Sequence, residues 1–127
     1  MKKDCVFCGI VNGRLPATIL AESETCLAIM PKQMEVRGHH LILPKQHIES
    51  MFDVPEGGLA ELMNFAQEVC VNLQKNYGVE GVNLLHASGV AAQQSVPHFH
   101  IHLLPRFEGD GVNAWPSLPG SDELLQS

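Results

Sequence analysis

Residues 94–106 read QSVPHFHIHLLPR, a segment in which histidine alternates strictly with apolar residues. Alternation with a period of two is typical of a half-buried β-strand, so His98, His100 and His102 share one face of a strand predicted over 96–104. Successive side chains on that face are about 6.6 Å apart, close enough for neighbouring imidazoles to act on one small ligand. Histidine is not among the residues enriched in strands, so three exact repeats indicate a functional face.

Length and composition predict one globular domain, 1–127, in which 107–127 forms a C-terminal tail. The chain is 45% apolar and 17% charged, and it has no run of the roughly 20 apolar residues that cross a bilayer. Its start lacks a signal-peptide core, so we expect a cytoplasmic protein without a membrane partner. A net charge of −6 argues against nucleic acid as a partner, whereas a small phosphorylated ligand remains compatible.

The rest of the chain predicts an α+β domain. Strands are expected over 18–22, 25–30, 39–44, 81–87 and 96–104. One long helix is expected to start at Asp53, with Pro55 in its first turn, and to stop at Gly78, because the apolar residues between follow i, i+3, i+4 spacing. Short links between the strands favour a five-stranded antiparallel sheet with the helix packed on one face.

Two cysteines near the start have the spacing of a zinc site. Cys5 and Cys8 form a Cys-x-x-Cys pair, and two histidines from elsewhere would complete a Cys₂His₂ centre. His47 and His98 are the candidates for this structural zinc. A redox pair and an uncoordinated pair are the alternatives. The three alternating histidines themselves diverge too much along a straight strand to form a catalytic zinc site.

With His98 assigned to the metal, His100 and His102 are left for chemistry. A neutral imidazole whose one N–H is held by an acceptor has a bare nitrogen that can attack phosphorus. A second imidazole can protonate the leaving group, and we assign this general-acid role to His102. Gln94 and Ser95 enter the strand where they can hydrogen-bond phosphate or leaving-group oxygens, or else simply cap the loop.

The segment 98–104 resembles the His-φ-His-φ-His-φ-φ signature of the histidine triad (HIT) superfamily, where φ is apolar. Further matches are CVFCGI at 5–10, GHHLILPKQH at 38–47, GVN at 81–83 and PR at 105–106. The resemblance implies a five-stranded antiparallel sheet with a long helix, paired into a homodimer with a continuous sheet. It implies a nucleotide hydrolase or nucleotidyl transferase that acts on phosphoramidates or dinucleoside polyphosphates. Its implied residues are His100 as nucleophile, His102 at the leaving group, His39 as a fourth histidine on the substrate side, and Cys5, Cys8, His47 and His98 as ligands of a structural zinc.

The chain departs from the family pattern at positions that usually contact the nucleotide. Pro31 stands where an aspartate usually binds the ribose, and Ala87 where an asparagine usually contacts phosphate. Ser88, beside Ala87, is therefore a candidate substrate-binding residue. We expect hydrolysis through a covalent nucleotidyl-histidine. The alternatives are a nucleotide-binding regulatory module with weak or no turnover, and a hydrolase that uses catalytic zinc.

Overall fold

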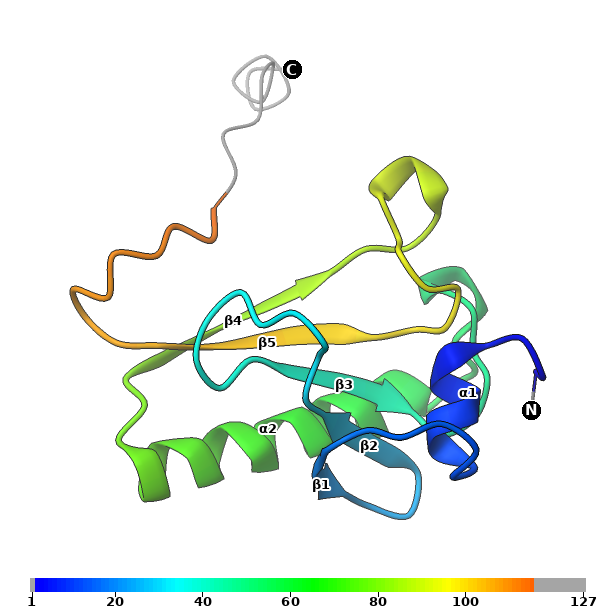
Figure 1. Ribbon diagram of the computed structural model, residues 1–127, viewed down its shortest axis with the longest axis horizontal. Helices are drawn as coiled ribbons and strands as arrows, with labels where there is room; N and C mark the ends of the chain where they lie inside the picture. Colours follow the sequence, from blue (N-terminus) through cyan, green and yellow to red (C-terminus); the bar gives the residue numbers. More distant parts are fainter. Residues whose placement is uncertain (1, 116–127) are drawn as a thin grey trace.

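The computed structural model describes residues 2–115, and the predicted fold class is confirmed. The elements are α1 (Val6–Val11), β1 (Ile19–Glu22), β2 (Cys26–Ile29), β3 (His40–Pro44), the 3₁₀ turn η1 (Met51–Asp53), α2 (Gly58–Tyr77), β4 (Gly81–His86), the 3₁₀ turn η2 (Val90–Ala92) and β5 (Ile101–Arg106) (Figure 1). The five strands form one antiparallel sheet in the order β1-β2-β3-β5-β4. Within the predicted tail, residues 107–115 have neither helix nor strand, and 116–127 lie outside the described residues.

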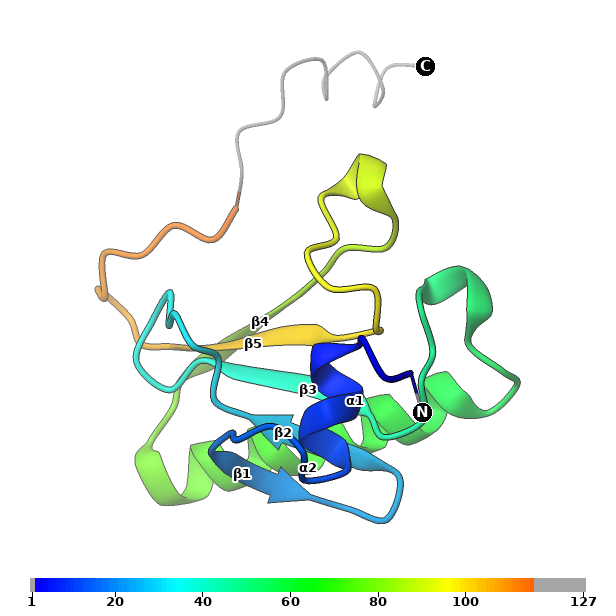
Figure 2. The ribbon, with the colours of Figure 1, turned by 45° about the vertical axis from the view of Figure 1, so that its right-hand side comes forward.

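The two helices cover opposite faces of this sheet, with α1 in front of β2 and β3 and α2 behind them (Figure 2). The larger core lies between α2 and the sheet, because the helix buries an apolar stripe there. That stripe consists of Leu62, Phe65, Ala66, Val69 and Leu73. The smaller core lies under α1 and consists of Cys5, Phe7, Cys8, Leu27, Ile29, Leu41 and Leu43. Both faces of the central strands are therefore buried.

The long helix starts later than the sequence predicted. It begins at Gly58, after Gly57 in the left-handed conformation, whereas Asp53 ends the η1 turn. The Asp53 carboxylate accepts a hydrogen bond from the Ser50 hydroxyl at 2.8 Å, and that hydroxyl also caps η1 at the Phe52 N–H. Asp53 is thus used by a separate turn. The predicted end at Gly78 is confirmed, because this residue has a φ of 66° and its N–H closes the last helical turn.

The histidine strand is also shorter than predicted, since β5 begins at Ile101. Pro97 has no N–H, and the Phe99 N–H donates to the Ile48 carbonyl at 2.6 Å instead of to a neighbouring strand. The alternation of faces persists through this irregular start. Phe99 and Ile101 belong to the core under α2, whereas the rings of His98 and His100 face α1 on the other side.

None of the helices within residues 2–115 is long and apolar enough to cross a membrane.

Candidate functional site

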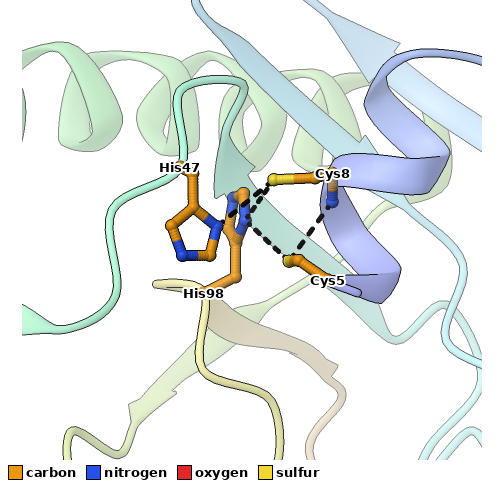
Figure 3. A group of neighbouring side chains, drawn as sticks. All are labelled: Cys5, Cys8, His47 and His98. Carbon is orange, nitrogen blue, oxygen red and sulfur yellow. Dashed lines mark hydrogen bonds between the residues drawn. The ribbon is translucent and has the colours of Figure 1, made fainter. Parts of the chain in front are cut away.

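Four potential metal ligands meet where α1 approaches the start of the histidine segment (Figure 3). One ligand atom from each of Cys5, Cys8, His47 and His98 lies within 4.8 Å of the others. Nδ1 of His98 is 3.4 Å from the Cys5 sulfur and 3.6 Å from the Cys8 sulfur, and Nδ1 of His47 is 3.2 Å from the Cys8 sulfur. A tetrahedral zinc with bonds of about 2.3 Å to sulfur and 2.0 Å to nitrogen separates such atoms by about 3.6 Å. The spacing therefore fits zinc.

The hydrogen bonds around this cluster also fit a metal. Nε2 of His98 donates to the Pro44 carbonyl at 2.8 Å, which places the proton on Nε2 and leaves a lone pair on Nδ1 toward the sulfurs. The Cys5 sulfur in addition accepts the Cys8 N–H at the start of α1. The pKa of His98 is lowered to about 4, mainly because the ring is buried. The ring is therefore neutral and able to bind a cation. All four cysteines of the chain are free thiols.

His100, two residues further on, is a buried imidazole with one committed nitrogen. Its Nδ1–H donates to the His98 carbonyl at 2.8 Å, so Nε2 carries the lone pair. The ring packs edge-on against Phe7 of α1, with centroids 5.1 Å apart. Burial is the largest cause that lowers its pKa, and the neutral ring is the form with a nucleophilic nitrogen. His98 therefore contributes its ring to the group of potential metal ligands and its carbonyl to the orientation of His100.

His102 and His39 form a second pair on the same face. The Glu35 N–H donates to Nδ1 of His39 at 3.1 Å, so the proton of the neutral ring is on Nε2. That Nε2–H donates to Nδ1 of His102, 3.0 Å away. The chain of donors leaves the remaining proton of His102 on its Nε2. The rings of His102 and His100 are neighbours, with centroids 5.3 Å apart, so a ring with a free N–H adjoins a ring with a bare nitrogen.

The amino-acid sequence was compared with models of known protein families to identify the family of this chain. A model of the HIT domain matches residues 12–109. The chain belongs to the HIT family.

Relatives of the HIT protein cover most of its length. An uncharacterised HIT-like protein of Methanocaldococcus jannaschii is 39% identical, over 84% of this chain and 82% of the relative. The adenosine 5′-monophosphoramidase of Schizosaccharomyces pombe is 34% identical, over 97% of this chain and 91% of the relative. Among solved structures, a zinc-bound histidine triad family protein of Mycobacterium smegmatis has a TM-score of 0.82 and 33% identity, covering 97% of this chain and 91% of that one.

The loop that enters the histidine segment of this HIT protein uses its polar side chains internally. Gln94 accepts the Gly89 N–H at 2.7 Å and donates to the carbonyls of Glu49 and Val96. Both N–H groups of its amide are therefore engaged, and the side chain braces the loop. Ser95 lies exposed at the entry to the segment.

Ser88, like Gln94, is engaged within the protein. Its hydroxyl accepts the Met51 N–H at 2.8 Å and lies within hydrogen-bond distance of Nε2 of His86. His86, which the sequence patterns did not single out, also donates from Nδ1 to the His100 carbonyl at 2.8 Å. No spacing rule links residues 86 and 100, because only the pairing of β4 with β5 brings them together.

Acid should destabilise the protein in part through His102. Burial, followed by the neighbouring histidines His100 and His39, lowers the pKa of His102 in the folded state to about 4, whereas the ordinary value is 6.5. Between these values the unfolded chain binds the proton and the folded protein does not, so this stabilisation is complete above pH 6.5 and is lost as the pH falls toward 4. Thermal melts of wild type and His102→Asn across this window should show a steeper loss of Tm in wild type. Parallel curves would contradict the assignment.

Proposed function

We propose that this HIT protein is a nucleotide hydrolase or nucleotidyl transferase that forms a covalent nucleotidyl intermediate on His100. The observation that carries the proposal is the state of the His100 ring, buried and neutral, with Nδ1–H held by the His98 carbonyl and Nε2 bare. The family supports the reaction class, since one relative is named an adenosine 5′-monophosphoramidase. Phosphoramidates and dinucleoside polyphosphates of nucleosides are the substrate classes to test.

The proposed reaction has two displacements at phosphorus. Nε2 of His100 attacks, a P–N bond forms, and the electron pair of the bond to the leaving group goes to the leaving atom. For this step the His102 ring must first take up a second proton, which the negative charge of the bound phosphate favours; its Nε2–H then protonates the leaving atom and leaves a neutral imidazole. Water, or another acceptor, then attacks the same phosphorus and gives its proton to His102, while the electron pair of the P–N bond returns to His100. Pre-aligned groups of this kind save the entropy of assembling the reactants.

The other residues of the site have supporting roles in this proposal. His39, which is buried, holds His102 in the tautomer that donates from Nε2 and so acts on the substrate side through His102. We assign Ser95, which is exposed at the entry, to contact with phosphate oxygens. We assign Gln94 and Ser88 to the substrate side only through the loop that they shape, because their polar groups are bonded within the protein.

A series of leaving groups tests the role of His102. An amine leaves phosphorus only when it is protonated, whereas a nitrophenolate leaves without help. Replacing His102 by Asn should therefore slow the cleavage of an adenosine phosphoramidate by about 10²-fold or more, and slow a nitrophenyl ester of AMP far less. Steady-state rates on both substrates measure this ratio. Equal losses on the two substrates would remove His102 from the general-acid role.

The proposed metal is a structural zinc held by Cys5, Cys8, His47 and His98. The cluster ties α1 to the segments around residues 47 and 98, so a bound ion would cross-link three parts of the chain. The zinc-bound relative of Mycobacterium smegmatis supports the choice of metal. Reduced thiols suit a reducing compartment, which supports a cytoplasmic location.

We also propose a homodimer with a sheet that continues across both subunits. β4 is an edge strand of the sheet, and its apolar residues Val82 and Leu84 are more than one-third exposed (38% and 37%). Replacing Leu84 by Lys should therefore yield monomer in sedimentation velocity, because the charge would be buried without a partner. The matched control is Ile19→Lys in β1 at the opposite edge, which should leave the dimer intact. A monomeric wild type would contradict this proposal.

The rival function is a nucleotide-binding module without turnover, which the departures at Pro31 and Ala87 favour. Such a module would bind AMP but release no product from any phosphoramidate or dinucleoside polyphosphate. Incubation of the purified protein with both substrate classes, followed by chromatography of the nucleotides, tests the proposal. Release of AMP supports the enzyme, and unchanged substrate despite measurable binding supports the module.

A further inference from the structure

The β4–β5 ladder ends just before the residue that we propose as the nucleophile. The last backbone pair is His86 with Ile101, and the chain after His86 turns away into the loop that leads to η2. The carbonyl of His100, which precedes Ile101, is thus the first backbone acceptor on the β5 segment that has no partner strand opposite it. A buried carbonyl without a donor is costly, so a substitute donor is needed at this point.

The side chain of His86 supplies that donor. Its Nδ1–H donates to the His100 carbonyl at 2.8 Å, in the place where a longer strand would have offered a backbone N–H. The His86 ring also stacks on Phe99, with centroids 4.3 Å apart and planes inclined by 30°. Phe99 is 1% exposed, so this ring rests against the rigid core on the α2 side.

The opposite nitrogen of His86 is fixed as well. With the proton on Nδ1, Nε2 is an acceptor, and the Ser88 hydroxyl donates to it. The same hydroxyl accepts the Met51 N–H at 2.8 Å. A series of three hydrogen bonds therefore leads from η1 to the backbone of the nucleophile, through Met51, Ser88, His86 and His100. Each donor in it has one defined acceptor.

We propose that His86 is a positioning residue for His100. Two hydrogen bonds hold His100 from opposite sides of the sheet: its ring donates to the His98 carbonyl, and its own carbonyl accepts from the His86 ring. Together they fix both the peptide plane and the ring, and thereby the direction of Nε2. This inference rests on the proposed function of His100, and it assigns Ser88 to the orientation of His86.

Two substitutions separate the hydrogen bond from the packing of the ring. His86→Phe keeps a ring that can stack on Phe99 but loses the donor. His86→Asn loses the ring but keeps an N–H near the position of Nδ1. If the donor matters, Asn is the tolerated change and Phe the harmful one, whereas a purely packing role predicts the reverse order.

The test measures the rate of adduct formation in a single turnover with an adenosine phosphoramidate, together with the Kd for AMP. We expect His86→Phe to slow adduct formation by about tenfold or more and to change the Kd by less than about twofold, because misplacement of a nucleophile costs rate rather than binding. His86→Asn should recover most of the rate. An unchanged rate in His86→Phe, equal losses in the two variants, or a loss of AMP affinity that matches the loss of rate would overturn the inference.

A double variant examines Ser88. If Ser88 acts through His86, Ser88→Ala should slow adduct formation in wild type but add little to His86→Phe. Additive losses would instead place the Ser88 hydroxyl at the substrate and overturn its assignment to the orientation of His86.

A wild type that forms no adduct would contradict the proposed function but not, by itself, the role of His86. In that case ¹H–¹⁵N spectra of the imidazoles decide the question. The His100 ring signals should keep their wild-type positions in His86→Asn and should shift or broaden in His86→Phe, because the orientation of the ring is then less fixed. Unchanged His100 ring signals in His86→Phe would overturn the inference.

Discussion

Replacing His100 by Ala should abolish turnover while the protein still binds nucleotide. The change removes the bare Nε2 and leaves no alternative nucleophile in its place, so kcat should fall by about 10³-fold or more. The fold should survive, because the ring is edge-packed against Phe7 at the boundary of the smaller core and its loss removes no metal ligand. Rates of AMP release and the Kd for AMP, measured on the same preparations, check both statements.

The matched control for this variant is Cys26→Ala, which truncates another buried residue away from the histidine face. Cys26 is 2% exposed and belongs to the core under α2. It should lower Tm and leave kcat within about twofold, since core truncation costs stability and not chemistry. Turnover that persists in His100→Ala would contradict the role of His100 as nucleophile. Loss of both AMP binding and turnover would instead indicate that the ring is needed for binding.

Removal of the proposed zinc should produce the second large effect, a loss of thermal stability. Structural zinc contributes folding free energy directly, so a chelator should lower Tm by about 10 °C or more. Cys5→Ser should do the same without a chelator, because the hard hydroxyl is a poor substitute for a thiolate. Adduct formation should fall along with stability, since the carbonyl of His98 also holds the His100 ring.

Cys70→Ser is the control, because Cys70 lies on α2 outside the metal cluster. It should retain the full zinc content in elemental analysis, and its chelator-induced drop in Tm should match that of wild type. Loss of activity on chelation with an unchanged Tm would contradict a structural role and would favour a hydrolase that uses catalytic zinc.

Much of the fold was predictable because its signals are local. The alternation over 98–103 fixes which side chains face α1 and which face α2, and the helical stripe ending at Gly78 is equally short-range. The start of α2 was not predictable in this way. Asp53 has the character of a helix cap, yet its carboxylate bonds Ser50 in a separate turn, and only the tertiary course of the loop makes that choice.

The site shows the same division. The group of potential metal ligands was within reach because Cys-x-x-Cys is a short motif and the resemblance to the HIT family pointed to His47 and His98 as its partners. His86 was out of reach, because its importance lies in one hydrogen bond to a carbonyl fourteen residues away. Gln94 and Ser88 are predicted substrate contacts whose bonds within the protein sequence alone does not give: Gln94 bonds Gly89, Glu49 and Val96, and Ser88 bonds Met51 and His86.

The measurement that tests the central claim most directly is the intact mass of the protein, quenched in acid-free denaturant during turnover of an adenosine phosphoramidate. We predict a species heavier by one adenylyl group, which peptide mapping places on His100 and which is missing in His100→Ala. Turnover without such a species, or an adenylyl group on another residue, would contradict the proposal that His100 is the nucleophile.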